Sequence, residues 1–184
     1  MIKNKFTVQD LCLISTFTAL TVIMAQIVMP MPLGVPMTMQ TFAISLAGIM
    51  LGARRGFMSV LVYILLGAFG LPVFQSFTGG LGIVIGPTGG FILSFPIMAW
   101  IIGLGAEKQG KLPLIAGLVC GTAVNYIGGM VMFSAVTGNS LSAAFAACVL
   151  PFIPTAVIKA AAAALLGVKL KSRLVLLQAG GGNA

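Results

Sequence analysis

Lys159 is the residue whose charge and position are hardest to explain as simple packing. It lies five residues after Pro154, about 8 Å along a helix, inside the apolar run 154–171. If that run crosses a bilayer, a charge at this depth costs at least ~2.5 kcal/mol unless water or a partner accompanies it. The only acids, Asp10 and Glu107, fall in connections on the opposite side of the bundle that the sequence predicts. Lys159 is therefore expected either to extend to the outer lipid headgroups or to pair with a ligand carboxylate.

Few other polar residues fall at membrane depth. Asn125 and Tyr126 lie midway along one apolar run, and Thr38 and Gln40 open another. Thr88 begins a third, where it is also a candidate N-cap. Because an amide in lipid must find partners, Asn125 is expected to face the interior, as a contact between helices or as part of a ligand site.

A glycine-rich stretch offers exposed backbone near these residues. Its glycines allow a tight turn with close helix packing, or contact between bare N–H and C=O groups and a small polar ring. The stretch lacks the Gly-Lys-Ser/Thr ending of a phosphate loop. The candidate ligand contacts are Gly79, Gly80, Gly82, Gly86 and Gly89.

The residue types argue against an enzyme. The chain has no histidine, and its three cysteines are far apart in apolar context, so no zinc-site spacing occurs. No nucleophile–base pair, paired carboxylates or metal cluster is recognisable. We therefore expect no catalytic residue, no metal and no cofactor.

Composition indicates an integral membrane protein. Of 184 residues, 59% are hydrophobic and 7% are charged, and the mean hydropathy is +1.16. This leaves too little polar surface for a soluble domain. The net charge of +8 comes from sparse basic residues without aromatic interleaving, which favours a membrane explanation over nucleic-acid binding.

Six apolar runs predict six transmembrane helices in one membrane domain, 1–184, with its core at 10–171 and a flexible tail at 178–184. The short apolar segment 141–153 is expected to be re-entrant or interfacial. The predicted spans are 11–29, 39–53, 56–71, 88–106, 112–136 and 154–171.

Connections that carry charged residues alternate along the chain with connections that carry none. Apart from Lys159, every charged residue precedes span one, separates spans two and three or four and five, or lies at or beyond the end of span six. The loops 30–38, 72–87 and 137–141 carry no charge. The positive-inside rule therefore predicts a multi-pass protein of the cell membrane with both termini in the cytoplasm.

Spans two and three are too short to cross a bilayer unaided. About 15 residues give ~22 Å of helix, against a hydrocarbon core of ~30 Å. The outer loops after spans one and three are therefore expected to dip into the membrane. Irregular backbone at that depth is tolerated where it lines a cavity, so these loops predict a ligand site open to the outside.

Four motifs, in order along the chain, together resemble the BioY family, the biotin-binding S components of prokaryotic energy-coupling factor (ECF) transporters. The resemblance extends over about residues 10–171. The motifs are Pro36-x-Thr38-x-Gln40-Thr41, Leu46-Ala47-Gly48 with Leu51-Gly52, Gly67-Ala68-Phe69-Gly70-Leu71-Pro72-Val73-Phe74, and Gly86-Pro87-Thr88-Gly89-Gly90-Phe91.

The resemblance implies capture of biotin from outside, as a ligand and not as a prosthetic group. It also implies association with a transmembrane coupling protein and two ATPase subunits. By position, it makes Pro36 to Gln40 part of a lid, places Gly79 to Gly90 at the ring, and places Lys159 at the carboxylate.

Two positions depart from the family pattern. The family usually has an acid three residues before the lysine, where this chain has Ala156, which leaves Lys159 without an internal counterion. The Ala-x-x-x-Ala pattern that docks the coupling protein is represented by Ser15-x-x-x-Ala19, a pair that still permits close helix contact.

Three other functions remain open. An S component for another small anionic vitamin fits the same features. Thiamin is cationic, and the chain has no acid on its outer side to bind it. A self-contained secondary transporter is a second alternative, although neither an internal repeat nor an acid suited to ion coupling is evident. A purely structural membrane protein would leave Lys159 and the dipping loops unexplained.

Overall fold

The computed structural model describes residues 7–31 and 35–180, with side chains up to residue 171. Lys3, Lys5, loop residues 32–34 and tail residues 181–184 lie outside these ranges, and α7 continues to Gly180. The elements in chain order are α1 (Val8–Ala25), β1 (Val28–Met29), β2 (Met37–Thr38), α2 (Gln40–Ala68), η1 (Gln75–Phe77), α3 (Leu81–Val84), α4 (Gly89–Glu107), α5 (Lys111–Thr137), α6 (Leu141–Cys148), η2 (Leu150–Phe152) and α7 (Ile153–Gly180).

Helix α1 starts at a capping box and ends earlier than the apolar run predicted. The Thr7 side chain accepts from the Asp10 N–H, and the Asp10 carboxylate accepts from the Thr7 N–H. The predicted span 11–29 is wrong at its end, because Val28–Met29 pairs with Met37–Thr38 as an antiparallel ribbon. Apolar composition alone does not distinguish these strand residues from helix, so the all-α prediction missed the β1–β2 ribbon.

Helix α2 folds back on itself at Gly52. This residue has φ +79°, a left-handed conformation that favours glycine. A Cβ added to Gly56 would lie 3.2 Å from the Gly48 Cα, although eight residues of straight helix span ~12 Å. The two arms of α2 therefore pack against each other, and the break predicted between spans two and three lies at this reversal.

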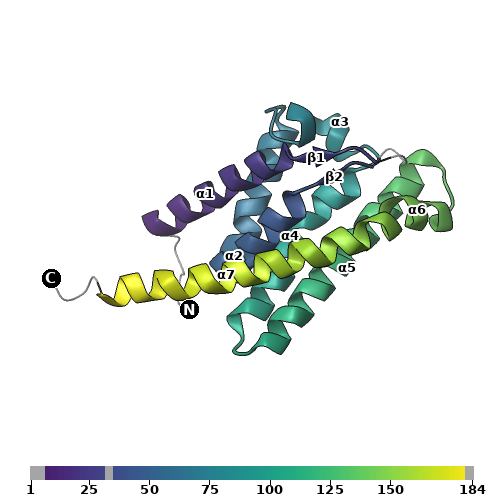
Figure 1. Cartoon of the computed structure of the whole chain (residues 1–184). Coiled ribbons are helices and arrows are strands. Elements are labelled where there is room, and N and C mark those ends of the chain that lie inside the picture. The colour runs from purple at the N-terminus through teal and green to yellow at the C-terminus, as the bar shows by residue number, and fades with distance from the viewer. Residues whose placement is uncertain (1–6, 32–34, 181–184) are drawn as a thin grey trace, which may run out of the picture.

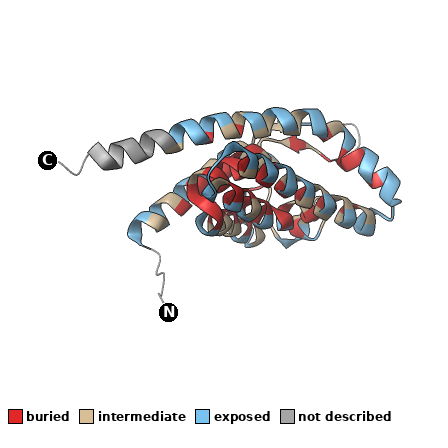
Figure 2. Cartoon of the chain, turned by 90° about the horizontal axis from the view of Figure 1, so that it is seen from below, coloured by how far each residue is buried: buried red, intermediate tan, exposed pale blue. Residues whose placement is uncertain are grey.

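The two arms of α2 pack with α4 and α5 around a buried core. Ile44, Ile49, Met98 and Ile102 are fully or almost fully buried there. Figure 2 shows the buried residues concentrated in the central helices, while most of α7 is exposed along its outer side. Five described helices are long and apolar enough to cross a membrane, counting α2 once. Their exposed apolar faces are those of a multi-pass membrane protein.

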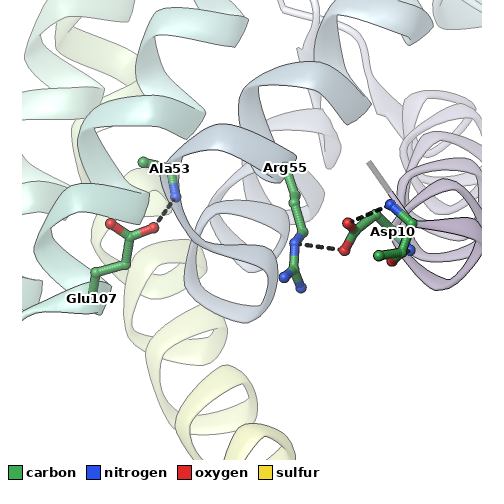
Figure 3. Close-up of polar contacts among 5 residues, drawn as sticks. Asp10, Ala53, Arg55 and Glu107 are labelled. Atoms are coloured by element: carbon green, nitrogen blue, oxygen red, sulfur yellow. Dashed lines mark hydrogen bonds and ion pairs between the residues drawn. The ribbon is translucent and has the colours of Figure 1, made fainter. Parts of the chain in front are cut away.

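Charged groups gather at one end of the bundle. Arg55 Nε lies 2.9 Å from Asp10 Oδ1, and Glu107 Oε1 accepts a 2.8 Å hydrogen bond from the Ala53 N–H, as Figure 3 shows. Lys171 Nζ donates to a backbone carbonyl of α4 at the same end. The β1–β2 ribbon, α3 and α6 lie at the opposite end (Figure 1). The prediction that both acids lie away from Lys159 is confirmed.

Candidate functional site

The cavity that brings the polar candidate residues together, called the main cavity below, opens among the β1–β2 ribbon, the loop after α2, and helices α4, α5 and α7. It contains about 590 Å³ of space free of protein atoms, the mouth included. Its lining residues are Val35, Pro36, Thr38, Gln40, Thr41, Phe74, Gln75, Thr88, Phe91, Ile92, Phe95, Asn125, Tyr126, Phe152 and Lys159.

Lys159 lines this cavity instead of extending to the outer headgroups. Its Nζ donates a 3.0 Å hydrogen bond to the Thr38 carbonyl of β2. An ammonium has three donors, and Thr38 O is its only acceptor among the residues that the structure describes. Both acids of the chain lie at the charged end, so the cavity has a cation without a protein counterion. An anionic ligand would be favoured at this position.

Gln40 is held in place by two hydroxyl groups. Its Oε1 accepts a 2.7 Å hydrogen bond from Thr38 Oγ1, and its Nε2 donates to the Tyr63 hydroxyl. Gln40 and Tyr63 are both buried, and the Tyr63 ring packs edge-on against Phe74 in the cavity wall. This network fixes the start of α2 against the ribbon. Tyr63, outside the cavity lining, was missed because nothing in its apolar surroundings distinguishes it from a core tyrosine.

Asn125 both joins two helices and faces the cavity. Its Nδ2 donates to Phe91 O at 2.9 Å and to Ser94 Oγ at 2.8 Å, which connects α5 to α4. The residue is 1% exposed, and its Oδ1 has no partner within the described part of the chain. Thr41 Oγ1 is likewise buried without a partner there. Because unsatisfied buried oxygens are costly, these two are suited to receive a ligand's donors.

Aromatic rings form most of the apolar wall. Phe74 and Phe95 are almost fully buried, and Phe91 and Phe152 complete the surface, with Tyr126 beside them. Such rings provide a large, rigid contact area for a flat or bicyclic ligand. The sequence identified Tyr126 but not the phenylalanines, since a phenylalanine in an apolar span resembles ordinary core.

The glycines predicted to contact a ligand are not among the lining residues. A Cβ added to Gly79 would lie 2.2 Å from Leu71 O, and one added to Gly89 would lie 1.9 Å from Val84 O. These two therefore permit close backbone packing around α3, and Gly80, Gly82 and Gly86 lie in the same region. Ring contact by the five glycines stays a prediction. Thr88 does line the cavity and occupies the N-cap position of α4. Its side chain, however, does not make the capping hydrogen bond that was predicted.

The loop after α2 is held in an unusual conformation beside the cavity. Ser76 and Phe77 have φ of 55° and 56°, in the left-handed region that residues other than glycine rarely adopt. Gln26, at the end of α1, donates from Nε2 to Phe74 O at 3.0 Å and accepts at Oε1 from the Phe77 N–H at 2.8 Å. This side chain positions Gln75 in the wall. Sequence reasoning missed Gln26, although an amide ending an apolar run was an available signal.

The predicted docking pair is not part of the cavity lining. Ser15 and Ala19 are both exposed, one turn apart on the outer face of α1.

Within the described residues no three His, Cys, Asp or Glu side chains approach closely enough to hold a metal ion. With Lys159 and the phenylalanine rings in its wall, the cavity is suited to a small anionic molecule with an apolar body.

Comparisons with known proteins agree with this geometry. The BioY family model matches residues 1–175. A probable biotin transporter BioY of Pyrococcus horikoshii is 41% identical over 164 residues, covering 89% of this chain and 96% of that protein. The biotin transporter BioY of Thermotoga maritima is 39% identical over 157 residues, covering 84% and 91%.

A solved structure has the same fold. The crystal structure of the S component for biotin from an ECF-type ABC transporter matches with a TM-score of 0.82 and 26% identity, covering 94% of this chain and 95% of that one. These relatives are transport proteins and not enzymes. With a family model that matches nearly the whole chain and relatives this similar, the chain belongs to the BioY family.

Proposed function

We propose that this chain is the membrane-embedded subunit that captures biotin from outside the cell for ATP-driven uptake by an ECF-type transporter. The observation that carries the proposal is the main cavity, which combines one lysine, two buried oxygens without partners in the described chain and a phenylalanine wall. The similarity to biotin transporters and to a solved S component for biotin supports biotin as the ligand.

Biotin is complementary to each part of the cavity. Its carboxylate would neutralise Lys159, whose Nζ has donors to spare beyond the bond to Thr38 O. Its fused rings would pack against the phenylalanine wall. The N–H groups of its ureido ring would find an acceptor in Asn125 Oδ1. Thr38, Gln40, Thr88 and Tyr126 complete the contacts that we propose.

We propose six membrane spans with both termini in the cytoplasm of a prokaryotic cell. The spans are α1, the two arms of α2, α4, α5 and α7. The gathering of Arg55, Asp10, Glu107 and Lys171 at one end supports this orientation, because positive residues favour the cytoplasmic side. The loops after α1 and α2 then face outward, and the cavity they border opens to the outside.

The partners that we propose are a transmembrane coupling protein and two ATPases. The exposed pair Ser15 and Ala19 supports α1 as a docking face, because small residues one turn apart let two helices approach closely in a bilayer. Biotin is the cargo in this proposal, and no cofactor takes part.

The test is equilibrium binding of biotin to the detergent-purified chain, beside Lys159→Met. Loss of a hydrogen bond between charged groups, ~1.5–3 kcal/mol, should weaken binding roughly 10- to 100-fold. Riboflavin and pantothenate serve as competitors, and tight binding of either in place of biotin would redirect the proposal to that vitamin. Uptake by proteoliposomes without ATPases would favour the secondary transporter.

A further inference from the structure

A five-residue loop after α2, residues 74–78 and called the wall loop below, closes on itself beside the main cavity. The Phe74 N–H donates to Thr78 O at 2.9 Å, and the Thr78 hydroxyl donates to Gln75 O at 2.8 Å. Phe74 and Gln75 line the cavity, whereas Ser76 and Phe77 form an exposed tip. The conformation of the wall loop therefore sets the position of two cavity residues.

The wall loop is anchored at its first residue only. The Phe74 ring is fully buried, packs edge-on against Tyr63 and lies against Gly67 of α2, where an added Cβ would clash with the ring. The tip has no such anchor, since the Phe77 side chain is 71% exposed and Ser76 is exposed as well. The position of the tip therefore depends on its backbone and on the contacts made to it by other elements.

The backbone of the tip has a conformation that its residues disfavour. Ser76 and Phe77 have φ of 55° and 56°, two consecutive residues other than glycine in the left-handed region. A residue with a Cβ disfavours this conformation by roughly 5- to 30-fold, a penalty that glycine escapes. A tip free to relax would leave this conformation, so a contact from outside must stabilise it.

Gln26, the residue that follows α1, provides this contact. Its Nε2 donates to Phe74 O at 3.0 Å, and its Oε1 accepts from the Phe77 N–H at 2.8 Å. The same Nε2 also donates to Val22 O at 3.1 Å, one turn back on α1, which fixes the orientation of the amide. One side chain therefore connects the anchored residue and the exposed tip of the wall loop to α1.

We propose that Gln26 is a positioning residue for the ligand site, whose amide holds the wall loop closed against its own backbone strain and so slows ligand binding and release. When the two bonds to the loop break, Ser76 and Phe77 relax, and Gln75 leaves the cavity wall. Gln26 does not line the cavity, so it acts through the loop and not by contact with the ligand. This inference rests on the proposed function, since it takes biotin as the ligand.

The experiment measures the Kd and the association and dissociation rates of biotin with the detergent-purified chain and its variants. Gln26→Met keeps the length of the side chain and removes both bonds to the loop. Dissociation should become faster, and the Kd should rise roughly 5- to 100-fold, the value of two hydrogen bonds. Adding Ser76→Gly removes the penalty at one strained residue and should recover roughly 5- to 30-fold of the lost affinity. Adding Ser76→Ala keeps the penalty and should recover none.

Ser76→Gly alone decides the question if Gln26→Met does not fold. By stabilising the closed loop, this substitution should slow the association and the dissociation of biotin alike, while the Kd stays the same. Thr16→Val is the matched control on α1. It removes one hydrogen bond to Cys12 O within the helix, away from the wall loop, and should change none of the three constants.

Three results would overturn the inference while the proposed function stands. Gln26→Met with the Kd and dissociation rate of the parent would mean that the amide does not control the site. If Ser76→Gly and Ser76→Ala restore a weakened Gln26→Met equally, or not at all, the amide supports the fold in general and not the strained tip. Unchanged rates in Ser76→Gly alone refute the inference equally. A parent chain that binds no biotin would remove the proposed function and this inference together.

Discussion

Asn125→Leu should weaken ligand binding without lowering the stability of the unliganded protein. Leucine has nearly the shape of asparagine but neither donates nor accepts hydrogen bonds. The Asn125 side chain joins α5 to α4 through Phe91 O and Ser94 Oγ, and its Oδ1 has no partner in the described part of the chain. The substitution therefore removes two formed hydrogen bonds and one unsatisfied acceptor at once.

The stability terms nearly cancel in the unliganded protein. Hydrogen bonds between membrane helices contribute ~0.6 kcal/mol each on average, so two of them give about 1.2 kcal/mol. The single hydroxyl proton of Ser94 still has an acceptor, Gly90 O at 2.8 Å or Phe91 O at 3.0 Å, so the Ser94 hydroxyl is not left unsatisfied. Removing the buried Oδ1 recovers ~1–3 kcal/mol. The variant should be as stable as the parent or slightly more stable.

Ligand binding should respond in the opposite direction. If Oδ1 accepts from the ureido ring, its loss costs ~1–1.5 kcal/mol, or roughly tenfold in Kd. Titration calorimetry gives the Kd, and thermal melting in detergent with and without biotin gives the stability. Ligand-induced stabilisation follows RT ln(1 + [L]/Kd), so the rise in Tm at fixed biotin should shrink in Asn125→Leu.

Ser134→Ala is the matched control. Ser134 lies on the same helix and its Oγ donates to Asn139 O, away from the cavity, so biotin affinity should not change. An Asn125→Leu variant that binds biotin as tightly as the parent would refute the role of Oδ1. A variant several kcal/mol less stable without ligand would refute the energetic reasoning, because the two bonds would then matter more than the unsatisfied oxygen.

Three further outcomes are expected. Gly89→Ala should lower the Tm strongly or prevent folding, because its Cβ would lie 1.9 Å from Val84 O, whereas Gly82→Ala meets nothing within 4 Å and should melt like the parent. Glu107→Ala should destabilise by ~1–3 kcal/mol in thermal melts, because it removes the acceptor at the reversal of α2, and Glu107→Gln should largely restore stability by keeping that oxygen. Ser15→Trp should leave biotin binding unchanged but abolish ATP-driven uptake in proteoliposomes with the coupling module, and normal uptake would contradict α1 as the docking face.

The positions of the helices could be predicted because the bilayer imposes strong rules on sequence. Apolar runs must be long enough to span it, and charges must stay near its edges. The predicted runs 88–106 and 112–136 differ from α4 and α5 by one residue at each end. The end of α1 was missed because Val28–Met29 pairs with Met37–Thr38, a contact that the apolar composition of the run 11–29 does not reveal.

The polar part of the site could also be predicted, for the same physical reason. A lysine or an amide in an apolar run is costly unless it has a specific partner, so Lys159, Asn125 and Gln40 stand out. The phenylalanine wall carries no such cost. Phe95 has the same favourable burial whether it lines a cavity or fills a core, so only the fold reveals its role.

The unpaired oxygens are the strongest internal argument that the cavity is a binding site. A core selected for stability alone would satisfy Asn125 Oδ1 and Thr41 Oγ1, since each costs ~1–3 kcal/mol when left without a partner. Both lie in the wall that Lys159 also lines. Within the described chain, a charge without a counterion and two oxygens without donors converge on one space, and a ligand with a carboxylate and N–H groups would remove these costs together. Binding such a ligand should therefore stabilise the fold as well as fill the cavity.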